Sequence, residues 1–324
     1  MKKIIAIALT LVLTLTMLAG CGGSSAPAAD APAAEGEKLK IGIIQIVEHP
    51  SLDQIRTTFV DELAALGYDD SKVEIDYQNA QNEMSNVTSI CQKFVGDEVD
   101  MIVAIATPSA QGAAAATTDI PIIFSAVTDP LSAELVDDMN APGGNCTGTS
   151  DAIPVEQIFN LADELTPGMQ TYGFIYNLSE VNSVSVIEQC KAYLDAKGLK
   201  YEEATVANVG ELTTAAESLV GKVDAFFSPI DNTVASGMVT VAEIAKDNAI
   251  PYYVAADTMV YDGGLATVGV DYVQLGKQTA SMAVEVLEGA DPATMPVEIM
   301  ENYATVVNPE TAEALGVDVS KYAQ

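Results

Sequence analysis

The sequence predicts an α/β protein made of two doubly wound, Rossmann-like lobes that are joined by a hinge of several chain crossovers. Short apolar runs alternate with amphipathic helical patterns from about residue 39 onward, which is typical of parallel strands with right-handed helical crossovers. A turn-rich break, Ala141 to Gly148, interrupts the alternation, which then begins again. About 290 residues follow the N-terminal segments, a length that suits two cores better than one.

The first 38 residues are predicted to stand apart from this fold. Residues 1–20 are interpreted as a lipoprotein signal peptide, with an apolar run from Ile4 to Met17 that is short for a membrane span. Small residues before Cys21 resemble a bacterial lipobox, in which this cysteine is lipidated; an ordinary secretory signal is the alternative. Residues 21–38 are predicted to be a flexible linker. We therefore expect an extracytoplasmic protein, anchored to the cell membrane by lipid.

Composition restricts the function classes. The formal charge of -32 becomes -34 once Lys2 and Lys3 are removed with the signal peptide. So acidic a chain argues against binding to nucleic acid or to anionic lipid. Cys91, Cys146 and Cys190 are odd in number and widely spaced, which is not a disulfide framework. Cys91 and Cys190 fall on apolar helix faces, so we expect buried thiols.

The first lobe is assigned residues 39–150 plus 272–296. An apolar, β-branched run predicts its first buried strand, and Ser51 with Gln54 forms a capping box that starts the first helix. Gly67 and Gly96 end the first two helices. The predicted strands are 41–46, 73–77, 101–106 and 121–125; the predicted helices are 51–66, 84–94, an alanine-rich helix after residue 107 and a short helix after residue 130.

The second lobe is assigned residues 151–271 plus 297–324, with a hinge near residues 149–151. The same alternation returns here, and the segments after residue 272 are expected to cross the hinge again. The predicted strands are 171–176, 200–206, 223–228, 251–254 and 265–270; the predicted helices are 155–165, one ending at 194, 211–220, one ending at 247 and 273–287.

The loops at the carboxyl ends of the strands carry the candidate site, because ligands bind there in open α/β sheets. These loops hold hydroxyls, amides and carboxylates but no lysine or arginine, which argues against phosphate and sulfate ligands. Thr107 and Ser109 at a helix start favour a carboxylate, whereas Asp231, Asp257 and Glu48 suit an ammonium group. The loops therefore favour a zwitterion. Aromatic residues near strand ends are candidates to pack an apolar ligand side chain: Phe124, Tyr176, Phe227 and Tyr253.

Each candidate also has a structural interpretation. Ser51, Ser109 and Asp231 suit helix caps, His49 suits a structural histidine, and Glu180 suits a solvated side chain. The aromatic residues suit the core, and Asp257 suits a turn. Catalysis has little support, because the single histidine cannot build a zinc site and no nucleophile elbow, dinucleotide fingerprint or P-loop is present. We therefore predict no metal site, no cofactor and no enzyme activity.

Several motifs taken together resemble the ABC-transporter substrate-binding lipoproteins related to the tryptophan-binding TrpX group. The motifs are the lipobox with its linker, residues 41–53, 106–111, 122–130 and 145–151, and the resemblance extends from about Lys40 to the C-terminus. It implies a type I periplasmic-binding-protein fold that closes on an amino acid, chiefly tryptophan or phenylalanine, and delivers it to an ABC permease and its ATPase. The chain has no tryptophan, so any stacking must come from Phe or Tyr.

By analogy with amino-acid binders of this fold, the ligand carboxylate would meet Ser109 and residues 125–128. The ammonium would meet Asp231, with Asp257 or Asp151 as alternatives. We expect a monomer; a sugar or nucleoside receptor, a sensor for a membrane kinase and a secreted hydrolase are the competing hypotheses. The predicted ligand-binding residues are Glu48, His49, Thr107, Ser109, Ser125, Thr128, Asp151, Tyr176, Asn177, Asp231, Asn232 and Asp257.

Overall fold

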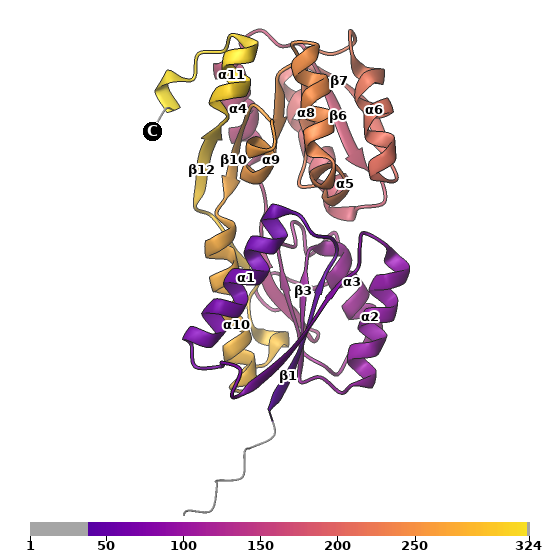
Figure 1. Ribbon diagram of the computed structural model, residues 1–324, viewed down its shortest axis with the longest axis vertical. Helices are drawn as coiled ribbons and strands as arrows, with labels where there is room; N and C mark the ends of the chain where they lie inside the picture. Colours follow the sequence, from indigo (N-terminus) through magenta and orange to yellow (C-terminus); the bar gives the residue numbers. More distant parts are fainter. Residues whose placement is uncertain (1–37, 323–324) are drawn as a thin grey trace, which may run out of the picture. The chain divides into compact units, whose positions relative to one another are not determined.

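The structure is a computed structural model that describes residues 38–322 (Figure 1). Cys21, the predicted signal peptide and nearly all of the predicted linker lie outside the described residues. Residues 38–322 form two six-stranded sheets with helices on both faces. Within that range, no helix has the combination of length and apolarity that a membrane span needs.

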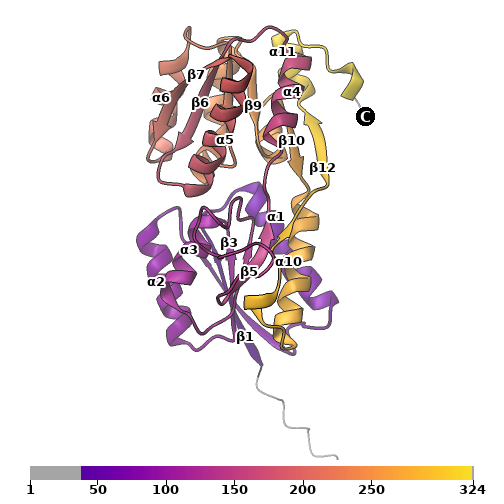
Figure 2. The ribbon, with the colours of Figure 1, turned by 180° about the vertical axis from the view of Figure 1, so that it is seen from behind.

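The first sheet is parallel throughout and has the strand order β11-β5-β4-β3-β1-β2. The apolar run of β1 is buried over residues 41–45, as expected for a central strand that is covered on both faces. Figures 1 and 2 show α1 and α10 on one face of this sheet and α2 and α3 on the other. The strands are β1 Leu39–Gln45, β2 Val73–Asn79, β3 Met101–Ile105, β4 Ile122–Ser125, β5 Cys146–Ser150 and β11 Glu298–Ile299.

The second sheet repeats this plan with the order β12-β10-β9-β8-β6-β7. Its strands run parallel except β12, which pairs antiparallel with β10. Helices α4 and α5 cover one face, and α6 and α8 cover the other (Figures 1 and 2). The strands are β6 Thr171–Asn177, β7 Lys200–Val206, β8 Ala225–Ser228, β9 Tyr252–Val254, β10 Ala266–Val270 and β12 Tyr303–Val307.

The helices follow the predicted order with few additions. The α-helices are α1 Pro50–Ala65, α2 Met84–Gly96, α3 Thr107–Ala116, α4 Val155–Leu165, α5 Val181–Lys197, α6 Leu212–Leu219, α7 Asn232–Ser236, α8 Met238–Asp247, α9 Asp257–Tyr261, α10 Tyr272–Leu287 and α11 Pro309–Leu315. Short 3-10 turns cover Val209–Glu211, Pro292–Thr294 and Ser320–Tyr322.

The chain crosses between the two sheets three times. It leaves the first sheet after β5 and returns through α10, which packs on α1, β4 and β5. It crosses a third time between β11 and β12. The predicted assignment of residues 297–324 to the second lobe is wrong at its start, because β11 pairs with β5 and residues 298–299 therefore belong to the first sheet. A two-residue strand carries no periodicity, which is why the sequence did not reveal it.

Three predicted helix features are wrong. Helix α1 begins at Pro50 with His49 as its N-cap, so Ser51 is not a cap; proline suits the first helical position, since its missing N–H has no partner there. Residues 130–135 form turns rather than a helix, because Asp129 accepts the Ser132 N–H and Glu134 takes φ 57°. The helix that ends at Asp247 is split in two at Gly237. Helices α9 and α11 were not predicted.

The three cysteines within the described residues are free and buried, as predicted for Cys91 and Cys190. Burial raises the pKa of the Cys91 and Cys146 thiols to about 11. A thiol with so high a pKa holds almost no thiolate at neutral pH, so these cysteines behave as small apolar side chains.

Gly148 in β5 permits a close approach to β4. It has φ 155°, and a Cβ built on it would lie 2.0 Å from the backbone oxygen of Phe124. We expect Gly148→Ala to lower the free energy of unfolding by at least about 3 kcal/mol, because backbone atoms of a central strand must move. Urea denaturation measures this. Gly144→Ala is the matched control, since a Cβ there meets no atom within 4 Å; equal stability of the two variants would contradict the prediction.

Candidate functional site

The carboxyl ends of the strands in the two sheets are joined by side-chain hydrogen bonds. Asn82 donates to the Thr233 hydroxyl over 3.0 Å, and Nε2 of His49 lies 3.4 Å from Oδ1 of Asn232. Ser51 bonds the Thr258 hydroxyl, and Ser185 bonds the Asp129 carboxylate. In both sheets the strand order reverses beside the first strand, at β1 and β3 and at β6 and β8. Open α/β sheets bind ligands at such switch points.

The start of α3 presents two hydroxyls without partners. Ser109 Oγ and Thr107 Oγ1 are buried and have no hydrogen-bond partner among the described residues. The N-cap of α3 is Ala106, so the interpretation of Ser109 as a cap is wrong. Ala106 has φ 76° and ψ 155°, a conformation that costs roughly 1–3 kcal/mol and is concentrated at functional sites. Two free hydroxyls with the N–H groups of a helix start can hold an anion.

These free hydroxyls give a contrast with Ser125. We expect Ser109→Ala to leave unfolding unchanged or to stabilise the unliganded protein, because a buried unpaired hydroxyl costs roughly 1–3 kcal/mol. Ser125→Ala should lower the free energy of unfolding by about 1 kcal/mol, because its hydroxyl is bonded. Thermal and urea unfolding of the two variants measure the difference. If Ser109→Ala proved the more destabilising of the two, the Ser109 hydroxyl would have a partner that this structure lacks.

Ser125 itself belongs to a buried hydroxyl cluster within the first lobe. Its Oγ lies 2.8 Å from the Thr279 hydroxyl and 3.3 Å from the Thr149 hydroxyl, and Thr279 donates to the Leu275 carbonyl. The cluster ties β4 and β5 to α10. The Ser125 hydroxyl is thus engaged in contacts between structural elements.

Asp151 is a buried carboxylate without a cationic partner among the described residues. It follows β5, accepts a hydrogen bond from Thr128 over 2.9 Å and lies 3.4 Å from the Tyr272 hydroxyl. Burial raises the pKa of Asp151 to about 6, although both hydroxyls oppose this shift. A carboxylate offers about four acceptor sites, so these two bonds leave it open to a further donor, and a cation would also compensate its charge.

Asp231 serves mainly as the N-cap of α7. Its carboxylate accepts from Val234 N over 2.8 Å, Asn177 N over 2.6 Å and Ser183 Oγ over 2.7 Å. Burial, followed by the nearby charge of Glu180, raises the pKa of Asp231 to about 7. The structural interpretation of Asp231 is therefore confirmed, and its acceptor sites are largely occupied.

Glu180 is buried, so the expectation of a solvated side chain is wrong. One carboxylate oxygen accepts from Thr233 N and Oγ1, each over 3.0 Å. The other accepts from Asn232 N over 3.0 Å, from Asn232 Nδ2 over 2.6 Å and from Asn182 Nδ2 over 3.3 Å. These donors include backbone N–H groups at the start of α7, where an anion is favoured. Glu180 thus fixes the residues that face His49 and Asn82.

The other predicted residues are divided between the core and the surface. The Tyr176 hydroxyl donates to Glu203, and its ring is buried in the core of the second lobe. Phe124, Phe227 and Tyr253 are also core residues. Glu48 is exposed, and Asp257 is partly buried at the start of α9, where burial raises its pKa. Asn177 uses its amide on Thr233 and Ser179.

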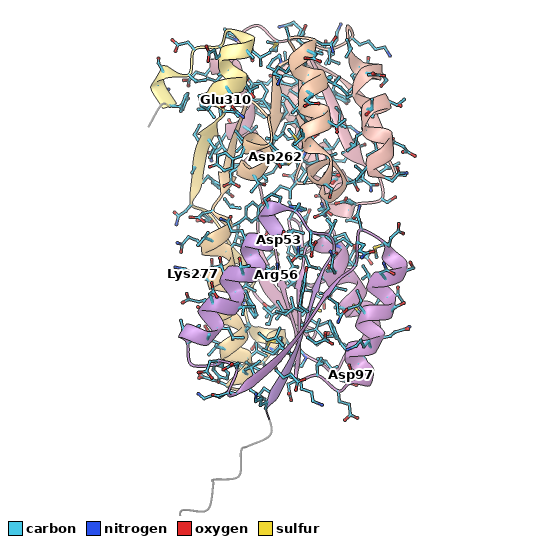
Figure 3. All side chains as sticks on the ribbon, in the orientation of Figure 1. Asp53, Arg56, Asp97, Asp262, Lys277 and Glu310 are labelled. Atoms are coloured by element: carbon cyan, nitrogen blue, oxygen red, sulfur yellow. The ribbon has the colours of Figure 1, made fainter. Side chains whose placement is uncertain are left out.

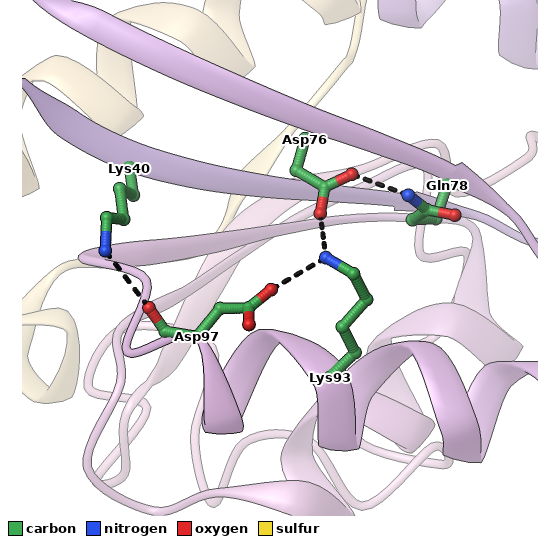
Figure 4. Close-up of polar contacts among 5 residues, drawn as sticks. All are labelled: Lys40, Asp76, Gln78, Lys93 and Asp97. Carbon is green, nitrogen blue, oxygen red and sulfur yellow. Dashed lines mark hydrogen bonds and ion pairs between the residues drawn. The ribbon is translucent and has the colours of Figure 1, made fainter.

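Two groups of positive charge in the first lobe are paired with carboxylates, and one of them, Arg56, lies beside the carboxyl ends of β1 and β2. Arg56 pairs with Asp53 at 3.6 Å on α1 (Figure 3) and lies 4.4 Å from the centre of the Tyr77 ring. Figure 4 shows a second cluster at the edge of the first sheet, in which Lys93 joins Asp76 and Asp97. Such exposed pairs contribute little to stability. No group of metal-ligating side chains large enough to hold an ion occurs in residues 38–322.

Asn82 and Tyr272 are not among the residues predicted from the sequence. Asn82 lies three residues after the end of β2 and Tyr272 two residues after the end of β10, so the strand-end rule applied to these strands would have found both. Gln45 was also missed: it is buried, with Oε1 unpaired, and its amide donates to Val47 and Asp53. It lies inside the apolar run of β1, so the sequence pattern predicts a strand buried in the core and not a site residue.

Comparisons with known proteins agree with this fold. A family described as ABC transporter substrate binding protein matches residues 40–323. A tyrosine-binding protein of Clostridioides difficile is 41% identical over 318 residues, 97% of this chain and 92% of that protein.

Solved structures are also similar. An ABC domain in complex with L-Trp from Streptococcus pneumonia is 42% identical, with a TM-score of 0.85 over 87% of this chain and 96% of that one. The ligand-free, open structure of an adhesive substrate-binding protein from Clostridium difficile is 43% identical, with a TM-score of 0.67 over 86% and 95%. The predicted type I periplasmic-binding-protein fold is thereby confirmed. The chain belongs to the ABC transporter substrate-binding family, whose members bind solutes and are not enzymes.

Proposed function

We propose that this protein captures an aromatic amino acid as a zwitterion for an ABC importer. The observation that supports this proposal is a pair of complementary groups at the ends of β3 and β5, the two strands that flank β4: unpaired hydroxyls at the start of α3 and the uncompensated Asp151 carboxylate. The hydroxyls would hold the ligand carboxylate, and Asp151, with Thr128 beside it, would hold the ammonium. The relatives' ligands, tyrosine and tryptophan, supply the aromatic part of the proposal.

Asp151 replaces Asp231 as the proposed ammonium partner. Both acids are buried, but Asp231 already accepts three hydrogen bonds within the second lobe. A neutral sugar or nucleoside would leave the Asp151 charge without compensation in a buried site, which is unfavourable. The charge therefore favours an amino acid over the sugar hypothesis.

Closure of the two lobes is the proposed capture step. The hydrogen bonds that join Ser51, Asn82, His49 and Asp129 to residues of the second lobe form only when the strand ends meet. The higher TM-score against the tryptophan complex than against the open, ligand-free structure supports a closed arrangement here. A ligand that touches both lobes would favour this state over an open one.

A thermal-shift panel of amino acids, sugars and nucleosides tests the proposal. A ligand that binds only the native state raises the melting temperature, so we expect shifts with tyrosine, tryptophan or phenylalanine and none with sugars or nucleosides. A shift confined to sugars or nucleosides would refute it.

The proposal includes lipidation of Cys21, an extracytoplasmic location and delivery to a permease and its ATPase by a monomeric receptor. Labelled fatty acid should be incorporated into the full chain but not into Cys21→Ser, and the variant should appear in the medium. Equal labelling of both proteins would refute the lipid anchor.

A further inference from the structure

One ring nitrogen of His49 is an unpaired hydrogen-bond acceptor, and the neighbouring residues show which nitrogen it is. Glu180 accepts from Asn232 Nδ2 over 2.6 Å, and a carboxylate can only accept. The Asn232 amide must therefore turn its oxygen toward His49, and that oxygen lies 3.4 Å from Nε2. Because an amide oxygen only accepts, Nε2 carries the proton and Nδ1 carries a lone pair.

This lone pair has no donor among the described residues. The His49 side chain is only 7% exposed, and Nδ1 is unpaired. Gln45 cannot supply a donor, since its amide is committed to the Val47 carbonyl and to Asp53. Burial lowers the pKa of His49 to about 4, so the ring is neutral at pH 7 and Nδ1 remains an acceptor there. A buried unpaired acceptor is unfavourable and points to a ligand donor.

His49 follows β1, and the order of the strands places it near the side chain of the proposed ligand. Asp151 follows β5, Thr107 follows β3 and His49 follows β1, and these strands lie in the order β5-β4-β3-β1. Neighbouring strands are about 4.8 Å apart. An amino acid with its ammonium at Asp151 and its carboxylate at Thr107 would thus direct its side chain toward β1.

Resting on the proposed function, we infer that His49 is a specificity-determining residue that accepts, through Nδ1, a hydrogen bond from the ligand ring. The site then selects aromatic amino acids whose ring carries an O–H or N–H group, such as a phenol or an indole. Phenylalanine would fill the same space and leave Nδ1 unpaired. Sites that hydrogen-bond a substrate group strongly reject the analogue that lacks it.

Isothermal titration with two ligand pairs tests this inference on the wild-type protein. Tyrosine is compared with phenylalanine, and tryptophan with its benzothienyl analogue, in which sulfur replaces the indole N–H. For at least one pair we expect the donor-bearing ligand to bind roughly 10- to 100-fold more tightly. Equal affinity within each pair that binds overturns the inference but not the proposed function. Failure of all four ligands to bind overturns both.

Two variants of His49 separate the two ring nitrogens. His49→Gln places an amide near the Nε2 position and keeps a donor for Asn232, but removes the acceptor at Nδ1. His49→Asn places an amide near the Nδ1 position and can still offer an oxygen there. We expect the Gln variant to lose the discrimination within a pair and the Asn variant to keep part of it. Wild-type discrimination in the Gln variant overturns the inference.

Discussion

Asp151→Asn should lower the affinity for an amino-acid ligand by roughly 30- to 1,000-fold, because loss of one partner from a buried charge pair costs about 2–4 kcal/mol. The shape of the side chain is kept, and the contacts with Thr128 and Tyr272 can still form. Titration calorimetry at pH 7 measures the loss. Asp231→Asn is the matched control, since that acid is equally buried but already accepts three hydrogen bonds; a larger loss there would return the ammonium to Asp231.

The same Asp151 variant should be more stable than the unliganded wild type at neutral pH. The folded-state pKa of Asp151, about 6, lies above the ordinary value of 3.8. Between about pH 4 and pH 6 the folded protein holds a proton that the unfolded chain has lost, so the free energy of unfolding falls as pH rises through this window. At pH 7 the full cost is present, of order 3 kcal/mol. The stability gain of the Asn variant should therefore nearly vanish at pH 4.

Ligand binding should show the complementary pH dependence. An ammonium prefers the ionised carboxylate, so affinity should rise from pH 5 to pH 7 and level off above the Asp151 pKa. The groups that face Asp151 are Thr128 from the loop after β4 and Tyr272 on α10. Tyr303 on β12 is also close enough for the charge of Asp151 to help raise the pKa of its hydroxyl. Neither tyrosine ionises in this range, since their pKa values are raised above 10. A pH dependence that persists in Asp151→Asn would assign it to another group.

Glu180→Ala should be the most destabilising of the proposed substitutions, with a loss of about 4 kcal/mol in the free energy of unfolding. It would leave five buried donors on Asn182, Asn232 and Thr233 without their acceptor, and each such group costs roughly 1–3 kcal/mol before water enters. Urea unfolding measures the loss. The pKa of Asp231 should also fall, since the Glu180 charge helps to raise it.

Glu203→Ala is the matched control for Glu180. Glu203 also accepts from a side chain on a neighbouring element, the Tyr176 hydroxyl, and pairs with Lys191, but it lies at the exposed side of β7. Its loss should cost less than about 1 kcal/mol. Similar losses for the two variants would show that burial of the Glu180 network is not what makes it important.

The fold was predictable because the two sheets are built from strong local signals. Strand β7 and helix α4 begin and end at the predicted residues. For α4 the reason is an apolar helical period bounded by turn residues. The predicted start of α1 is wrong because Pro50 occupies the first helical position, so the helix begins before the capping box predicted at Ser51. Strand β11 depends on pairing with β5, a contact between residues about 150 apart, so no local pattern marks it.

The site was predictable in outline only. The strand-end rule located the loops, and the absence of cations from them favoured a zwitterion, but the rule does not say which side chains are already bonded. Asp231 and Ser125 are engaged within single lobes, whereas Asp151 and Ser109 retain free capacity. Glu180 was misjudged because its burial depends on packing against the start of α7. These distinctions depend on tertiary contacts that one sequence does not reveal.

The central claim is that the site binds both charged ends of an amino acid. Titration of the wild-type protein with tyrosine, with tyramine, which lacks the carboxylate, and with 3-(4-hydroxyphenyl)propionate, which lacks the ammonium, tests it most directly. We predict that tyrosine binds at one site and that each analogue binds at least about 10-fold more weakly. Binding of the propionate as tightly as tyrosine would contradict the role of Asp151 and the claim itself.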